Sequence, residues 1–301
     1  MNIFVTGSSG MLGSSLCDVL LKHHVVTGVG PNDLDVTKSD EWPELTSSSL
    51  HNLDAIIHCA AYTQVDAAEL IENRQILWDT NVESIHTLCD LCLKYDIRLI
   101  FPQTFLVLRG QDEFHPANSR SIDPLSWYAK SKWEAEKIIR ERLPPELRMI
   151  VSIGGFYGGG PDKDKNFIGL FLNKILPTAI RDGKKSIEIG DRVWQPTWVN
   201  DIAHVINWVL NNPWRDFYQY ATSDYASFAE IAQTIITSLG VEEIKINQIS
   251  SSQISEIAPR PKKIIMRSSE ELVRANLVHD YRSRLNCYLN ENWSNYSIQH
   301  Y

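Results

Sequence analysis

The stretch that decides the fold is Val5-Thr6-Gly7-Ser8-Ser9-Gly10-Met11-Leu12-Gly13. It follows an apolar run that predicts a strand and precedes apolar residues at helical spacing. In such a turn Gly7 permits the tight change of direction, Gly10 lets a pyrophosphate approach the backbone, and Gly13 lets helix and sheet pack closely. The first N–H groups of the helix and its dipole favour phosphate. We therefore interpret the stretch as a dinucleotide site rather than an ordinary strand-to-helix turn.

Short apolar runs alternate with longer helical patterns through the first half of the chain. The expected strands cover residues 2–6, 25–29, 54–59, 97–101 and 147–152, and the expected helices cover about 10–22, 74–95 and 124–140. Repetition of strand, crossover helix and strand predicts an α/β fold with a doubly wound parallel sheet, the NAD(P)-binding Rossmann fold.

A glycine-rich loop after Ser152 interrupts this alternation, and mixed short helices and strands follow it. We expect two interleaved domains. The Rossmann domain would cover 1–152 and about 193–222, and a smaller C-terminal α/β substrate domain would cover about 153–192 and 223–301.

The composition is that of a globular protein with an acidic charge balance. Of 301 residues 43% are hydrophobic, and 37 acidic against 29 basic side chains give a net charge of −8. This balance argues against a general nucleic-acid or anionic-membrane surface, and no apolar run approaches the ~18 residues of a membrane span. The N-terminus lacks a basic region and a cleavage site, so we expect no signal peptide. Five cysteines, an odd number, favour a reducing compartment, and we expect a cytoplasmic protein.

The end of the second expected strand bears on which dinucleotide binds. An acidic residue there holds the free 2′-hydroxyl of NAD, whereas an arginine accommodates the 2′-phosphate of NADP. The residues present, Thr27-Gly28-Val29-Gly30-Pro31, offer neither. The glycines leave room for a 2′-phosphate, so the sequence mildly favours NADP over NAD.

Tyr128 and Lys132 share one face of the helix expected over 124–140, because their spacing is i, i+4. A phenol has an ordinary pKa of about 10, too high for easy proton exchange at neutral pH. We expect the nearby ammonium to lower the pKa of Tyr128, which makes it a usable acid or base toward a carbonyl or an alcohol. Thr104 closes the preceding strand and adds a hydroxyl that can bond the substrate oxygen. These three are the candidate catalytic residues.

The glycine turn, Thr104 and the Tyr-x-x-x-Lys pair, in this order, resemble the extended short-chain dehydrogenase/reductase superfamily. The closer resemblance is to the dTDP-4-dehydrorhamnose reductase family, and it covers nearly the whole chain. Its motifs are similar to residues 1–7, 34–37 (LDVT) and 59–66 (CAAYTQVD). Further counterparts are Asn81, Tyr157-Gly158, Asn166-Phe167, Pro196-Thr197 and Arg260-Pro261.

The resemblance implies that NAD(P)H reduces the C4 ketone of a nucleotide-activated sugar. Tyr128 would donate the proton, Lys132 would also hold the nicotinamide ribose, and Thr104 would orient the carbonyl. The implied cofactor-binding residues are Gly7, Ser9, Gly10, Met11, Leu12, Gly13, Asp35, Val36, Ala60, Ala61, Tyr62, Thr63, Tyr128 and Lys132. The expected substrate contacts are Thr104, Phe105, Asp66, Phe156, Asn166, Gln195 and Arg260.

Departures from the family pattern lie in the half that faces the sugar. The family's S-T-D-Y-V-F-D-G is here QTFLVLRG at residues 103–110, which keeps the threonine and loses the serine and the aspartate. The tryptophan that packs on the sugar is missing from 152–157, and D-Q-x-G-x-P-T is replaced by DRVWQPT at 191–197. The cofactor frame is retained while the part facing the sugar is rebuilt.

Other candidates have simpler interpretations. Cys89 and Cys92 have the i, i+3 spacing of core thiols in a helix, and we expect no metal site. Asp66 and Glu69 are interpreted as a capping box that opens a helix, with Asp66 also at the edge of the substrate site. Arg260 begins a basic stretch, and we expect it to hold a diphosphate as a bidentate fork.

Three functions stay open at this level. The leading hypothesis is an NAD(P)-dependent oxidoreductase that acts on a nucleotide-activated keto sugar. The second is an epimerase that retains NAD; a dehydratase is disfavoured because Phe105 and Leu106 stand where it would place Asp and Glu. The third is a cofactor-binding regulatory subunit without catalysis. The expected partner is a nucleotide-sugar substrate, neither nucleic acid nor membrane is expected, and a homodimer remains open.

Overall fold

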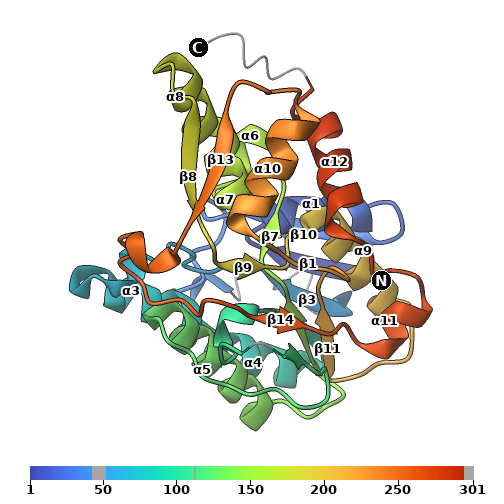
Figure 1. Cartoon of the computed structure of the whole chain (residues 1–301). Coiled ribbons are helices and arrows are strands. Elements are labelled where there is room, and N and C mark those ends of the chain that lie inside the picture. The colour runs from blue at the N-terminus through green and yellow to red at the C-terminus, as the bar shows by residue number, and fades with distance from the viewer. Residues whose placement is uncertain (43–51, 112, 295–301) are drawn as a thin grey trace.

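The computed structural model describes residues 1–42, 52–111 and 113–294, and a six-stranded parallel sheet lies at its centre (Figure 1). In spatial order the strands are β2 (Val25–Val29), β1 (Asn2–Thr6), β3 (Ala55–His58), β4 (Arg98–Thr104), β6 (Arg148–Ile153) and β11 (Phe217–Tyr220). The chain leaves β1 toward β2 and returns to the other side of β1 with β3, so the strand order reverses between β1 and β3. Ligands of open α/β sheets bind at such a switch point. The five predicted strands are confirmed, and β11 is a sixth that the apolar pattern did not single out.

Helices cover both faces of this sheet, which confirms the doubly wound arrangement. Side chains of one strand alternate between faces, and β1 shows the alternation: Ile3 and Val5 join one core cluster, whereas Phe4 joins the other. On the first face lie α1 (Met11–Leu20) and α9 (Val199–Leu210). On the second lie α4 (Ser84–Tyr95) and α5 (Trp127–Arg142). No helix in the described part of the chain is long and apolar enough to cross a membrane.

The helix expected over 74–95 forms, with one change of winding inside it. It consists of α3 (Arg74–Trp78), a π-helical turn η4 (Asp79–Glu83) and α4. Asn81 lies in this turn and is buried; its side chain bonds the backbone N–H and C=O of Tyr62 and the hydroxyl of Ser131 on α5. The wider turn therefore ties the loop after β3 to the helix that carries Tyr128.

The remaining helices and strands of the described chain are mostly short. They are η2 (Ala67–Glu69), η3 (Ile71–Asn73), η5 (Phe105–Val107), β5 (Phe114–His115), β7 (Phe156–Tyr157), α6 (Gly160–Lys163), α7 (Phe167–Leu170), η6 (Phe171–Ile175), α8 (Leu176–Arg181), β8 (Ser186–Gly190), β9 (Val193–Trp194), β10 (Thr197–Trp198), β12 (Ala226–Ser227), α10 (Phe228–Ser238), β13 (Lys245–Ile249), η7 (Ser251–Gln253), β14 (Ile265–Met266), α11 (Glu270–Arg274) and α12 (Tyr281–Asn292). Figure 1 shows the parallel pair β8 and β13 with α8 and α10 above the central sheet. The division into two domains with the boundaries given above stays a prediction.

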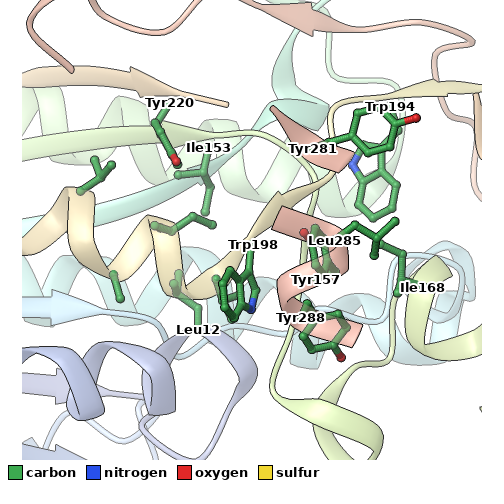
Figure 2. Packing of buried hydrophobic residues seen from close by; sticks show 14 of the residues in the cluster. Leu12, Ile153, Tyr157, Ile168, Trp194, Trp198, Tyr220, Tyr281, Leu285 and Tyr288 are labelled. Carbon is green, nitrogen blue, oxygen red and sulfur yellow. The ribbon is translucent and has the colours of Figure 1, made fainter. Parts of the chain in front are cut away.

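An aromatic cluster joins the later elements to the sheet. The rings of Tyr157 and Tyr288 lie 5.1 Å apart between centroids, and Trp198 lies 6.3 Å from Tyr288 (Figure 2). All three belong to the same core cluster as Leu12 of α1. This continuous core fixes the loop after β7 next to the glycine turn.

Candidate active site

A cavity of about 1150 Å³ opens at the carboxyl ends of β1, β3 and β4, where the strand order reverses. Its lining includes the glycine turn together with Thr104, Tyr128 and Lys132. The predicted site residues among its lining are Gly7, Ser9, Gly10, Met11, Leu12, Gly13, Asp35, Val36, Ala60, Ala61, Thr63, Asp66, Thr104, Tyr128, Lys132, Phe156, Asn166 and Arg260. Segments far apart in the sequence thus meet around one hollow.

The three glycines of the turn have different neighbours. Gly7 has φ +65°, and a Cβ there would lie 2.7 Å from the backbone nitrogen of Ala60. A Cβ on Gly13 would lie 2.1 Å from the Gly7 carbonyl oxygen, so packing of helix against turn excludes any side chain. A Cβ on Gly10 would meet only that same oxygen, at 3.2 Å. The fold therefore requires glycine at positions 7 and 13. At position 10 a Cβ would meet no atom other than this oxygen within 4 Å.

The start of α1 suits a phosphate group. Gly10 precedes its first residue and no side chain caps it, so the N–H groups of the first turn keep their hydrogen-bonding capacity. There is also no acidic residue in that turn to compete with an anion. An open glycine, uncapped N–H groups and a cavity of this volume together fit the pyrophosphate of a dinucleotide.

Thr104 and Tyr128 reach the cavity from the ends of two elements. Thr104 is the last residue of β4, and its hydroxyl oxygen accepts a hydrogen bond from the Leu106 N–H at 3.2 Å. Tyr128 stands in the first turn of α5, which begins where the Ser126 hydroxyl accepts from the Ala129 N–H at 3.1 Å. Side-chain caps at the starts of η5 and α5 therefore fix the backbone positions from which the hydroxyls of Thr104 and Tyr128 extend.

Burial, not Lys132, dominates the acidity of Tyr128. Burial raises the pKa of Tyr128 to about 12, and a hydrogen bond with the Thr104 side chain opposes this rise only in part. The expectation that Lys132 lowers the pKa of this phenol is therefore wrong in this structure. The cause is that an ionised phenolate loses more hydration in the buried site than the neighbouring hydroxyl restores.

Lys132 is buried one helical turn after Tyr128. Its Nζ lies 3.9 Å from the centroid of the Phe101 ring, and 5% of the residue is exposed. Burial lowers the pKa of Lys132 to about 8, while Cys59 and Glu136 oppose this change. The amine therefore titrates close to physiological pH.

His58 is a cavity residue that the sequence did not single out. It ends β3, lies 2% exposed, and its Nδ1 is 3.0 Å from the Thr6 hydroxyl. Burial, with the charge of Lys132, lowers the pKa of His58 to about 3, so the imidazole is neutral at physiological pH. Only its position at the end of a strand could have drawn attention to it.

Gln103 and Glu136 form a buried network under the candidate catalytic residues. The Gln103 amide nitrogen donates to the Lys132 carbonyl oxygen at 2.9 Å and to Glu136 Oε2 at 2.8 Å, and its oxygen accepts from the Thr104 N–H at 2.9 Å. Glu136 also accepts from Arg120 and Arg140. The sequence noted Gln103 only as a departure from the family pattern, because its partners lie on another element.

Three expected contacts, Tyr62, Phe105 and Gln195, are not among the residues that line the cavity. Gln195 is buried, and its amide bonds the Thr222 carbonyl and both backbone polar groups of Met266. Phe105 packs against the hydrophobic clusters of the core instead. Tyr62 contributes its backbone to Asn81. The side chains of Gln195 and Phe105 are thus engaged elsewhere in the chain, whereas Tyr62 is held through its backbone.

Asp66 and Arg260 form an ion pair at the rim of the cavity. The two guanidinium nitrogens donate to the two carboxylate oxygens at 2.8 and 2.9 Å, and the Ala258 N–H donates to the same carboxylate at 3.0 Å. The Arg260 side chain lowers the pKa of Asp66, against the effect of burial. The capping box expected of Asp66 and Glu69 is wrong: Asp66 makes no cap, and Glu69 accepts from the Trp127 N–H at 2.8 Å.

The buried carboxylate of Asp164 shapes the segment between β7 and α7, which also contributes to the cavity lining. Asp164 is 1% exposed and accepts from the N–H groups of Gly158 and Asn166 and from the Tyr288 hydroxyl. Burial raises the pKa of Asp164 to about 6 despite these bonds. This loop brings Lys163, Lys165 and Asn166 to the cavity.

Cys89 and Cys92 are core thiols, as predicted. Both are fully buried in α4, and burial raises the pKa of each. Within the described ranges no group of three or more His, Cys, Asp or Glu side chains could hold a metal ion.

Comparison with known proteins places the chain among related sequences. A family model described as RmlD substrate binding domain matches residues 1–293. The chain is 25% identical over 264 residues to the dTDP-4-keto-6-deoxy-D-glucose reductase of Streptomyces niveus, covering 87% of each chain. It is 25% identical over 288 residues to the dTDP-4-dehydrorhamnose reductase of Mycolicibacterium smegmatis, covering 94% of this chain and 83% of that one.

Solved structures share the architecture. A dTDP-4-dehydrorhamnose reductase from Clostridium acetobutylicum matches with a TM-score of 0.84 and 22% identity, over 96% of this chain and 99% of that one. A dTDP-4-dehydrorhamnose reductase from Bacillus anthracis in complex with NADP matches with a TM-score of 0.81 and 22% identity, over 96% and 99%. At these identities the likeness establishes the fold.

Proposed function

The chain belongs to the RmlD substrate binding domain family, and we propose that it reduces a keto group on a nucleotide-activated sugar with a nicotinamide dinucleotide as the hydride source. The observation that carries the proposal is the lining of one cavity. Thr104, Tyr128 and Lys132 line the same hollow as the glycine turn at the start of α1. An ordinary Rossmann core would not require a phenol, a hydroxyl and an amine to meet there.

The side chains suit a reduction. A bound reduced dinucleotide supplies the hydride for the carbonyl carbon. Tyr128 then donates a proton to the carbonyl oxygen; because the pKa of its phenol is about 12, it carries that proton at neutral pH. Thr104 orients the oxygen, since its hydroxyl already lies beside the Tyr128 side chain. Lys132, which lines the same cavity, would hold the nicotinamide ribose.

The sugar nucleotide would occupy the part of the cavity away from the glycine turn. Phe156, Asn166 and the positively charged Arg260 line the cavity. Lys163 and Lys165 add positive charge from the loop after β7, which lies next to the glycine turn. Basic side chains of this kind bind a diphosphate. Relatives named as reductases of dTDP-linked keto sugars support this substrate class.

Both NAD and NADP are candidates for the dinucleotide. The end of β2 carries Gly28 and Gly30 and no acidic residue, and this sequence feature mildly favours NADP. We also propose a cytoplasmic enzyme, in keeping with its free cysteines, and a homodimer, which sedimentation would test.

The test is incubation of the purified chain with NADH or NADPH and a panel of nucleotide 4-keto sugars. We expect oxidation of the reduced dinucleotide with at least one sugar, and its loss in Tyr128→Phe. Tyr225→Phe is the matched control, because Tyr225 is partly exposed and does not line the cavity. No oxidation above background with any sugar would contradict the proposal.

The same preparations distinguish the alternatives. An epimerase would release NAD into the supernatant when denatured. A regulatory subunit would bind a dinucleotide without turnover and would copurify with a partner.

A further inference from the structure

The residues after β2 fold back onto the end of that strand. The carbonyl oxygen of Gly30 accepts from the N–H groups of Asp33 and Leu34, both at 3.1 Å. In the opposite direction the Gly30 N–H donates to Asp33 Oδ2 at 2.8 Å. These bonds hold the Asp33 carboxylate against the strand end.

The Asp33 carboxylate lies close to the place that an acidic side chain at position 30 would occupy. A Cβ built on Gly30 would be 3.5 Å from Asp33 Oδ2 and 3.2 Å from the Ser9 hydroxyl oxygen. Ser9 belongs to the glycine turn, and both Ser9 and Gly30 line the cavity. An acid therefore lies beside the end of β2, three residues after Gly30, although Asp33 itself is not among the residues that line the cavity.

An acid at this place in a Rossmann fold accepts a hydrogen bond from the ribose 2′-hydroxyl of NAD. Asp33 Oδ2 already accepts from Gly30, whereas Oδ1 accepts from no described residue and is available for a hydroxyl. A 2′-phosphate would instead bring like charge against the carboxylate.

Among the described residues that line this end of the cavity, no lysine or arginine balances the charge of Asp33. The lining residues after β2 are Gly30, Pro31, Leu34, Asp35, Val36 and Thr37. The next cation along the chain, Lys38, is engaged by Glu41 Oε1 at 2.8 Å and by Asp35 Oδ2 at 3.7 Å.

We infer that Asp33 recognises the ribose 2′-hydroxyl and makes the chain select NAD over NADP. The inference rests on the proposed function and reverses the mild preference that the glycines suggest. The strand-end pattern misses Asp33 because a turn, not the strand itself, brings its carboxylate into place.

The test measures binding of NADH and NADPH separately to the purified full chain by calorimetry, without sugar and without turnover. We expect NADH to bind at least about tenfold more tightly than NADPH, the difference of one hydrogen bond to a charged group. Equal affinities, or tighter NADPH, would overturn the inference while leaving the reductase proposal intact. Absence of binding by either dinucleotide would overturn both.

Two variants locate the effect. Asp33→Asn removes the charge and keeps an acceptor for Gly30, so the NADH-to-NADPH preference should fall by about tenfold. Asp40→Asn removes a charge from the same exposed loop without contact to Gly30, and its preference should match the unmodified chain. A preference unchanged in Asp33→Asn would overturn the role of this residue.

Discussion

The side-chain amide of Gln103, a residue of the cavity lining, donates to the Glu136 carboxylate over 2.8 Å, and both residues are fully buried. The carboxylate can only accept when ionised, so it fixes which end of the Gln103 amide is the nitrogen. The oxygen end must then face the Thr104 N–H. A buried charge on α5 thereby sets the position of a hydroxyl at the end of β4.

Gln103→Leu should lower kcat by about 10- to 100-fold, because Thr104 and α5 lose their shared anchor and small misplacements are costly. Kinetics at saturating dinucleotide measure this. The control is Gln219→Leu, which removes an equally buried amide that bonds the carbonyls of His115 and Arg267 away from the cavity. A similar loss of kcat in both variants would show that Gln103 acts through general stability alone.

Lys132 should impose a pH limit on dinucleotide use. Its pKa of about 8 means that the ammonium is present below pH 8 and lost as the pH rises through that value. The kcat/KM for the dinucleotide should therefore fall above about pH 8. In Lys132→Met this kcat/KM should be low at every pH and should not show the fall. A profile of the unmodified chain that stays level through pH 10 would refute the assignment.

Asp164 should make folding less favourable as the pH rises from about 4 to 6. Its folded pKa of about 6 exceeds the ordinary value of 3.8, so the folded chain binds this proton more tightly. The stabilisation is complete below the unfolded pKa and is lost as the pH passes the folded one, a change of up to about 3 kcal/mol. Denaturant unfolding across this range should show the change in the unmodified chain relative to Asp164→Asn. Parallel pH profiles of the two proteins would contradict it.

The Asp66–Arg260 pair should matter more for substrate binding than for stability. The Asp66 side chain is half exposed, so the pair contributes no more than about 1 kcal/mol to folding. Asp66→Asn should release the segment around Ala258 and raise KM for the nucleotide sugar several-fold with little change in melting temperature. An unchanged KM would mean that Arg260 binds no substrate and only closes the rim.

Much of the fold followed from local pattern. The glycine turn, the alternation of strands and helices, and the i, i+4 spacing of Tyr128 and Lys132 each depend on neighbours in sequence. These features predicted the parallel sheet and gathered most of the candidate residues around one cavity.

What the sequence could not predict depends on contacts between distant segments. Asp66 meets Arg260 across 194 positions, and Gln195 is held by Met266 rather than facing the hollow. The acidity of Tyr128 was misjudged for a related reason: spacing shows which charge lies near, but the cost of burial depends on everything packed around the phenol.

The central claim is that this cavity transfers hydride to a nucleotide keto sugar. The most direct measurement supplies reduced dinucleotide with deuterium at the transferable position and follows the sugar product by mass spectrometry. We expect a single deuterium on the carbon that was the ketone, with none transferred by Tyr128→Phe. A protein that binds the dinucleotide yet leaves every sugar of the panel free of deuterium would contradict it.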